Sequence, residues 1–375
     1  MRSFLSQLRG RRQETAEKAE ESRVVPNSNE EFVSLPNHHC DFSVQRRVLS
    51  EDQELNRRVA ANEALVARAM QRNTVSMSPC GTGNLLSVRL QKTLPITQEE
   101  AVRRGIPTDR PLRLVCMSDT HSRLKTPEFA EVLENFPSAD ILLHAGDFTS
   151  TGKLAELQQF NAFCKALKDQ GKVKEVVVIA GNHDLTLDAP HYIDRAGHRF
   201  HGHQRESPKE CWDALTDVTL LQDASIEVYG LKIHGSPWQP EFYDWAFNLP
   251  PNTERIRVPW RAIPADADIV LTHGPVQGLG SLCKGGNHAG CELLLQELAE
   301  RVRPLLHVCG HIHEDYGAFV LHDQSEVSDD TNTSAVNTVF LNASTCTLRY
   351  RPTQPPVLID VHLAFLPTTD STSAQ

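Results

Sequence analysis

Five short aliphatic runs between residues 112 and 309 constrain the fold of this chain more than any other feature of its sequence. Each run has the length of a buried strand, and amphipathic helical patterns lie between the runs, for example at 154–171 and 291–302. This alternation predicts parallel strands joined by crossover helices. We therefore expect an α/β protein, a layered sandwich built around mixed sheets. The five runs are 112–117, 140–143, 175–180, 268–271 and 305–309.

Side chains that can bind metal ions follow all five runs. The carboxyl ends of the strands in an open α/β sheet converge on the ligand crevice, so the five segments are expected to meet. A single histidine at the end of a strand is more often structural than functional, but five such segments in order predict one shared site. In chain order these side chains are Asp119 and His121, Asp147, Asn182 with His183 and Asp184, His273, and His311 with His313.

The mixture of carboxylate, amide and imidazole groups predicts two divalent metal ions. Such a pair, about 3.5–4 Å apart, needs a bridging carboxylate and mixed nitrogen and oxygen ligands, and it lowers the pKa of a coordinated water toward ~7. We assign the bridge to Asp147. The first ion is expected to bind Asp119, His121 and His313, and the second Asn182, His273 and His311. Manganese, magnesium, iron and zinc all stay open as the metal.

His183 is not used by this assignment and is the candidate donor of a proton to the leaving oxygen. Two interpretations of its neighbour Asp184 stay open. In one, the Asp184 carboxylate holds the His183 tautomer and raises its basicity, which would make both residues catalytic. In the other, Asp184 is a turn carboxylate without a catalytic part.

The motifs D-x-H, G-D, G-N-H-D, H and G-H-x-H, in this order, resemble those of the calcineurin-like metallophosphoesterase superfamily over roughly residues 110–366. Longer strings, such as GSPWQPEFYDWAFNL at 235–249 and NASTC at 342–346, are similar to its metallophosphoesterase-domain-containing (MPPED-like) subgroup. The resemblance implies a four-layer αββα sandwich, a dinuclear centre bridged by Asp147, and His183 as the proton donor. Phe148, Thr149 and Ser150 follow Gly-Asp where protein Ser/Thr phosphatases have V-D-R-G, which argues against phosphoprotein hydrolysis.

We therefore expect a metal-dependent phosphoric ester hydrolase that acts on small phosphate esters through hydroxide held by the two ions. Phosphodiesters such as cyclic nucleotides are favoured over monoesters. The alternative is a scaffold or binding protein with this fold and vestigial activity, and the complete ligand set favours the enzyme. Arg123 is a candidate phosphate contact, and Trp238 and Tyr243 are candidate base-stacking residues, although a solvated arginine and satellite core packing are the simpler interpretations.

Four segments are expected along the chain. Residues 1–49 are polar and of balanced charge, which is typical of a flexible, disordered segment, and 367–375 are expected to be a flexible tail. Residues 50–109 are expected to hold one amphipathic helix and an extension of uncertain structure. The metallophosphoesterase domain is expected at 110–366. The helix of the preceding segment is expected to pack on this domain, with a partner-binding helix as the less favoured alternative, and the sequence does not identify a protein partner for the N-terminal region.

Composition narrows the classes of partner. A net charge of −10 disfavours general nucleic-acid binding. The nine cysteines form no C-x-x-C pair, which argues against a disulfide framework and favours a reducing compartment, the cytoplasm. The basic first twelve residues leave organellar targeting open. The longest aliphatic run, 176–180, is far shorter than the ~20 residues of a membrane helix.

Overall fold

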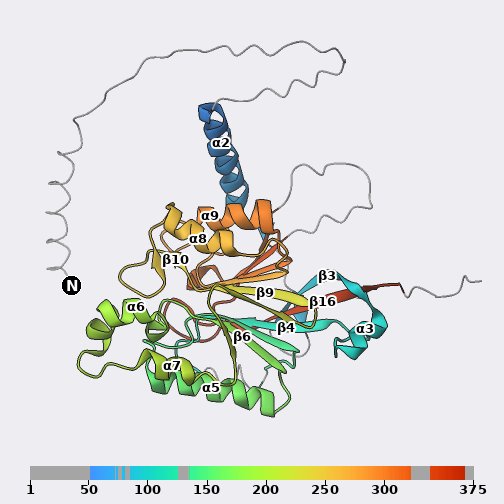
Figure 1. Cartoon of the computed structure of the whole chain (residues 1–375), viewed down its shortest axis with the longest axis horizontal. Coiled ribbons are helices and arrows are strands. Elements are labelled where there is room, and N and C mark those ends of the chain that lie inside the picture. Colours follow the sequence, from blue (N-terminus) through green and yellow to red (C-terminus); the bar gives the residue numbers. More distant parts are fainter. Residues whose placement is uncertain are drawn as a thin grey trace, which may run out of the picture. The chain divides into compact units, whose positions relative to one another are not determined.

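The structure is a computed structural model that describes residues 51–71, 73–74, 78–80, 85–125, 134, 136–321 and 338–367. These residues belong to one compact unit that begins at Glu51. Two seven-stranded sheets dominate this unit (Figure 1). The segment expected to be flexible at 1–49, and the expected tail at 367–375 apart from its first residue, lie outside the described residues.

The first sheet has the order β2-β3-β16-β4-β5-β6-β7. Its strands β4 to β7 are mutually parallel, and β16 runs antiparallel to β4 and parallel to β3. The three strands predicted here from aliphatic runs lie within two residues of their expected bounds. The strands are β2 (Ser78–Cys80), β3 (Leu85–Thr97), β16 (Val357–Leu366), β4 (Leu112–Met117), β5 (Ile141–Ala145), β6 (Glu175–Ile179) and β7 (Thr219–Leu221).

The second sheet has the order β1-β14-β15-β13-β12-β9-β8. Its central strands β15, β13, β12 and β9 are parallel, and β14 and β8 pair antiparallel with the strands beside them. A separate short pair joins β10 (Gln239–Pro240) to β11 (Asn248–Leu249). The strands of the second sheet are β1 (Asn73–Thr74), β14 (Gly317–Val320), β15 (Val339–Asn342), β13 (Leu306–Cys309), β12 (Ile269–Thr272), β9 (Leu231–Ser236) and β8 (Ala224–Val228).

Helices cover the outer face of each sheet (Figure 1). α5 (Leu154–Asp169) packs on the first sheet, and α8 (Glu254–Ala262) and α9 (Glu292–Gln296) pack on the second. Shorter helices complete the layers. They are α3 (Gln98–Arg103), α6 (Ala189–His191), α7 (Pro208–Asp213), the 3-10 turns Leu185–Leu187 and His313–Asp315, and the π-helical segments Tyr192–His201 and Glu297–Val302.

Among the described residues, the alternation of side chains along the strands builds three large cores, and Leu94, Ala101 and Ile106 form a small fourth cluster. In β4, Leu112 and Leu114 point into the core between the two sheets, whereas Val115 and Met117 point to the helix α5. A third core lies between the second sheet and α8 with α9. The expected four-layer αββα sandwich is therefore confirmed.

The helix α2 (Glu51–Met70) buries a face that the sequence predicts only in part, since Val66 of the predicted stripe packs against the core. The predicted stripe consists of Leu55, Val59, Val66 and Met70. In the structure Leu65 and Ala69 are the buried residues, and Val59 and Met70 are 49% and 36% exposed. The small side chain of Ala69 explains the choice of face, because a Cβ on Gly278 would lie only 2.8 Å from it. The side chain of Leu55 lies outside the described residues.

Residue 110 does not separate two structural units among the described residues. The short strand expected near 86–90 is part of β3, a strand of 13 residues that pairs along its length with β16. β3 therefore belongs to the same sheet as the strands that follow residue 110. In the described part of the chain, no helix combines the length and the apolar character needed to cross a lipid bilayer.

Asp140 links the start of β5 to the neighbouring strands β4 and β6 through hydrogen bonds. Its carboxylate accepts hydrogen bonds from both guanidinium nitrogens of Arg110, at 2.6 and 2.7 Å, from the backbone N–H of Arg113 and from Lys174. Burial by itself raises the pKa of Asp140, but these hydrogen bonds outweigh it and lower the pKa to about 2. Because Asp140 is charged in the native state, it holds the three strands β4, β5 and β6 in register at this end.

We expect Asp140→Asn to lower the free energy of unfolding by about 1–3 kcal/mol at pH 7, because several donors, two of them cationic, lose a buried charged acceptor. A carboxyl with a lowered native pKa stabilises above its unfolded pKa, near 4, and loses that contribution as the pH falls to about 2. Urea unfolding of the variant and of the wild type gives the two free energies of unfolding. The difference between Asp140→Asn and the wild type is expected to shrink over that pH range. Asp169→Asn, which removes an exposed partner of Lys165, is the control and should cost less than about 0.5 kcal/mol.

Candidate metal centre

The segments after β4, β5 and β6 meet those after β12 and β13. The backbone N–H of His121 donates to the carbonyl of Asp147 at 2.9 Å, which joins two segments of the first sheet. Across the sheets, the backbone N–H of His311 donates to Oδ2 of Asp119 at 3.0 Å. The hydroxyl of Ser344, after β15, donates to the same oxygen at 3.0 Å. Strand ends of both sheets thus form one site.

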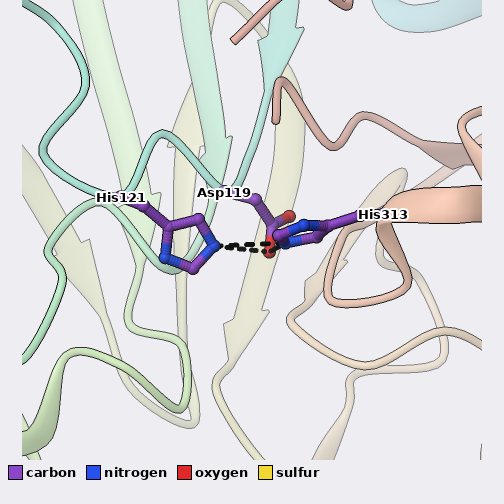
Figure 2. A group of neighbouring side chains, drawn as sticks. All are labelled: Asp119, His121 and His313. Carbon is purple, nitrogen blue, oxygen red and sulfur yellow. Dashed lines mark hydrogen bonds and ion pairs between the residues drawn. The ribbon is translucent and has the colours of Figure 1, made fainter. Parts of the chain in front are cut away.

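Asp119, His121 and His313 form the first ligand group (Figure 2). Nε2 of His313 lies 3.2 Å from Oδ1 of Asp119, and Nε2 of His121 lies 3.7 Å from the same oxygen. The two Nε2 atoms are 3.1 Å apart. One carboxylate oxygen and two imidazole nitrogens that point at one another are a donor set suited to a divalent transition metal.

Asp147 belongs to both further groups, one with His121 and His183 and one with Asp119 and His273. Its Oδ2 lies 3.3 Å from Nε2 of His273 and 3.8 Å from Nε2 of His121. The amide oxygen of Asn182 lies 3.0 Å from the same Nε2 of His273. A carboxylate shared between neighbouring ligand groups stands where a bridging ligand is required.

Backbone carbonyls orient two of the imidazoles. Nδ1 of His273 lies 2.8 Å from the carbonyl of Ala145, and Nδ1 of His313 lies 3.1 Å from the carbonyl of Thr347. A carbonyl oxygen can only accept, so Nδ1 carries the proton in both rings. In the neutral tautomer Nε2 then presents its lone pair to the site, the usual support for a histidine that binds metal.

The pKa values of the buried carboxylates and histidines indicate that the site is suited to cations. Burial alone raises the pKa of Asp119, but the hydrogen bond from His313 and the neighbouring imidazoles hold it well below its ordinary value. Burial alone lowers the pKa of His273, but the Asp147 carboxylate outweighs it and raises the pKa to about 9. Protons on histidines thus balance the buried carboxylates, and metal ions would replace these protons. Burial lowers the pKa of His311 to about 3.

Four of the expected ligands have left-handed backbone conformations that non-glycine residues rarely adopt. The φ angles are 53° at Asp119, 42° at His121, 55° at Asp147 and 66° at His311. Such conformations cost of order 1–3 kcal/mol each and persist where the surroundings enforce them, typically at functional sites. Gly310 shows how tight these surroundings are, because a Cβ there would lie 2.0 Å from Oδ2 of Asp119.

Hydrogen bonds match the second interpretation of Asp184. Its Oδ2 accepts from the backbone N–H groups of Asp147 and Gly181, and its Oδ1 from the backbone and hydroxyl of Thr149, at 2.7–2.9 Å. The ring of His183 is oriented by another group, since its Nδ1 lies 2.8 Å from the carbonyl of Ser150. The role of Asp184 as the orienting partner of His183 is therefore corrected. Burial and the charge of Asp147 raise the pKa of Asp184 to about 7.

The three residues expected to contact substrate differ in their burial and in the groups that they contact. Arg123 is exposed, and its charge acts on Tyr350 beside the ligand histidines. The indole of Trp238 donates to Asp223 at 2.7 Å and packs against two of the cores. Tyr243 is 76% exposed, and its ring contacts Phe242. The roles of all three in substrate binding stay predictions.

Other aromatic rings touch the imidazoles directly. Trp245 stacks on His183 with ring centroids 4.0 Å apart, and Phe242 meets His311 edge-on at 5.1 Å. Tyr350 meets His121 at 4.8 Å. From the same segment, sequence reasoning chose Trp238 and Tyr243 rather than Phe242 or Trp245. Tyr350 was missed, and its one signal is its position shortly after the NASTC string.

Comparison with known proteins identifies the family. Residues 112–315 match the family described as calcineurin-like phosphoesterase. The chain is 38% identical over 268 residues to Metallophosphoesterase domain-containing protein 1 of Homo sapiens, and also to that of Mus musculus, covering 68% of this chain and 74% of each relative. A UPF0046 protein of Caenorhabditis elegans is 32% identical over 256 residues, covering 67% of this chain and 82% of that protein. The chain therefore belongs to the calcineurin-like phosphoesterase family, which confirms the resemblance of its motifs.

We expect the purified chain, after reconstitution, to bind close to two divalent ions, and Asp147→Asn to weaken both because this carboxylate is shared between ligand groups. Elemental analysis after gel filtration gives the metal content. Asp213→Asn, which removes an exposed carboxylate on α7, is the charge-matched control and should retain both ions. A wild-type protein without bound metal, or full occupancy in Asp147→Asn, would contradict the assignment.

Proposed function

We propose that this member of the calcineurin-like phosphoesterase family is a metal-dependent hydrolase of small phosphate esters, with phosphodiesters such as cyclic nucleotides as its preferred substrates. The observation that carries the proposal is the set of overlapping ligand groups around Asp119 and Asp147. Overlap of this kind suits two neighbouring ions. A dinuclear centre is the arrangement that stabilises both the attacking and the leaving oxygen in a displacement at phosphorus.

Each ligand residue has a proposed part. Asp119, His121 and His313 would hold one ion, Asn182, His273 and His311 would hold the other, and Asp147 would be shared by both. When bound, the two ions would supply positive charge for the phosphoryl oxygens and lower the pKa of a water molecule toward ~7, so that it can attack phosphorus. Of manganese, magnesium, iron and zinc, we propose manganese as the first to test.

His183 is the proposed general acid. Its backbone N–H donates to Oδ1 of Asp147 at 2.7 Å, so the ring is carried by a segment fixed to the bridging carboxylate. Since Nδ1 faces the carbonyl of Ser150, Nε2 is the atom left to give a proton to the leaving oxygen. Trp245 stacks on the ring with centroids 4.0 Å apart and so helps to fix its orientation.

The aromatic rings support the choice of phosphodiesters. Phe242 borders His311, a proposed ligand of one ion, and Tyr350 borders His121, a proposed ligand of the other. A phosphate between the two ions therefore has an apolar ring near each end of the site. A diester carries an organic group on both sides of phosphorus and can use both contacts, whereas a monoester can use one.

The proposed setting follows from the cysteines and the charge. Cysteines such as Cys116, Cys164 and Cys309 are buried free thiols, which supports a reducing compartment, the cytoplasm. Burial raises the pKa of the Cys116 thiol and keeps it unreactive. The net charge of −10 supports a small phosphate ester rather than a nucleic acid as the partner.

The test is hydrolysis of a panel of phosphate esters by the full chain, loaded in turn with each of the four metals. We expect turnover that depends on added metal, is abolished by a chelator, and is faster on a cyclic nucleotide and a bis-aryl phosphate than on the related monoesters. Asp147→Asn, folded by circular dichroism, should be inactive. Metal-loaded wild type that hydrolyses none of the panel would instead favour a binding protein with vestigial activity.

A second prediction separates ligand from acid at His183, which lies near enough to Asp147 and His121 to be either. As an acid, His183→Ala should keep its metal content and lose roughly 10²–10⁴-fold in rate on esters with poor leaving groups. Esters of p-nitrophenol, whose leaving group needs no proton, should lose much less. Loss of one ion from the variant, or equal rate losses on both kinds of ester, would remove the acid role.

A further inference from the structure

A short turn after β15 brings Tyr350 to the metal centre. The backbone N–H of Tyr350 donates to the carbonyl of Thr347 at 2.7 Å, and the N–H of Thr347 donates to the carbonyl of Arg351 at 2.8 Å. The carbonyl of Thr347 also accepts from Nδ1 of His313 at 3.1 Å. The turn that carries Tyr350 is therefore the turn that orients a proposed metal ligand.

A second attachment fixes the same segment to the other side of the first ligand group. The backbone N–H of Thr345 donates to the carbonyl of Ser118 at 2.7 Å, next to Asp119 in the chain. The segment is thus tied at one point to the end of β4 and at another to His313. Tyr350 has little freedom to move relative to the ligands.

The Tyr350 ring faces three imidazoles of the site. Its centroid lies 4.8 Å from that of His121, 5.5 Å from that of His313 and 6.2 Å from that of the proposed acid His183, in edge-to-face arrangements. The charges of Asp119 and Asp147 also act on its phenol group. The ring consequently stands beside both the proposed first ion and the proposed acid.

Simple core packing does not account for this placement. Tyr350 is 40% exposed, so the residue is partly accessible to solvent, and its backbone has a φ of 56°. A bulky residue in the left-handed region is strained, whereas glycine or asparagine would suit the turn at lower cost. An exposed ring held in a strained turn against ligand imidazoles has the features of a contact for a bound molecule.

We propose that Tyr350 contacts the substrate and selects it by the organic group that stays on phosphorus, favouring a planar aromatic group over a small alkyl group. This inference rests on the proposed phosphodiester hydrolysis and names a residue that determines its specificity. The ring offers an aromatic surface to the retained group, and the phenol O–H is available to a phosphate oxygen or a sugar hydroxyl.

The test uses two diesters with the same leaving group, phenyl p-nitrophenyl phosphate and methyl p-nitrophenyl phosphate, and the full chain loaded with Mn²⁺. Tyr350→Ala should raise KM for the phenyl ester about 3- to 10-fold, the effect expected of one aromatic pair, and change kcat little. KM for the methyl ester should change less than about twofold. Tyr350→Phe should retain the preference for the phenyl ester, because it keeps the ring.

Two further variants serve as comparisons that test the role of Tyr350 in substrate selection. Trp212→Ala removes a 42% exposed ring on α7 and should leave both substrates unchanged. Tyr243→Ala tests the competing expectation from the sequence, and its comparison with Tyr350→Ala is matched because both tyrosines are exposed and have a left-handed backbone. If Tyr243→Ala weakens the phenyl ester selectively and Tyr350→Ala does not, the inference about Tyr350 is overturned.

Other outcomes separate this inference from the proposed function. Loss of metal from Tyr350→Ala, or equal effects on both esters, would assign Tyr350 to support of His313 alone and overturn its role in selection. If the wild type hydrolyses neither ester, the proposed function is wrong. The role of Tyr350 in selection is then tested separately, by calorimetric measurement of the binding of phenylphosphonate and of methylphosphonate to the Mn²⁺-loaded chain. Selective weakening of phenylphosphonate by Tyr350→Ala supports the inference. Equal weakening of both, or no binding of phenylphosphonate to the wild type, refutes it.

Discussion

The metal centre depends on one buried carboxylate, that of Asp184, which is fully enclosed. Its Oδ2 accepts the backbone N–H groups of Asp147 and Gly181 at 2.9 and 2.8 Å, so a single atom sets the separation between the turn after β5 and the turn after β6. The backbone N–H of His183 then reaches Oδ1 of Asp147. Buried donors left without an acceptor would each cost ~1–3 kcal/mol. The Asp147 carboxylate, the proposed bridge, and His183, the proposed acid, are therefore held in place by hydrogen bonds within the protein itself.

This arrangement concentrates negative charge, and the pKa values of the neighbouring histidines respond to that charge to different extents. Burial by itself lowers the pKa of the four proposed ligand histidines, yet the Asp147 carboxylate is close enough to His273 to raise its pKa, and the hydrogen bond to Asp119 raises that of His313. His121 and His311 stay neutral. The two rings with raised pKa values mark where positive charge is most needed. Metal binding should accordingly release protons and become weaker as the pH falls, because ions and protons compete for the same nitrogens.

Much of the fold and the ligand set could be predicted from the sequence because local signals carried both. A buried parallel strand needs a short aliphatic run, and the residue after it enters the crevice, so Asp119 and His273 were readable from position alone. β3 was underestimated because the polar residues in it, such as Lys92, become strand residues only through pairing with β16. The buried face of α2 was predicted only in part because Ala69 looks unremarkable until Gly278 is brought against it.

The residues that sequence reasoning missed reach the site through contacts between segments that are distant in the chain, and no motif records such contacts. Tyr350 follows a polar turn, and nothing in its neighbours reveals that Thr347 will accept from His313. Two buried histidines, one on each sheet, lie behind the site and hold hydroxyl groups in place. His144 on β5 lies 3.2 Å from the hydroxyl of Thr120, between two proposed ligands.

His307 on β13 lies 2.8 Å from the hydroxyl of Thr272, directly before His273, so each sheet uses the same device. Burial lowers the pKa of both His144 and His307 to about 3, and both rings are therefore neutral. A lysine or arginine in either place would add a fixed positive charge behind the site and oppose the binding of cations. A neutral imidazole can hold the threonine hydroxyl without that penalty, so the charge of the centre is left to the carboxylates and the ions.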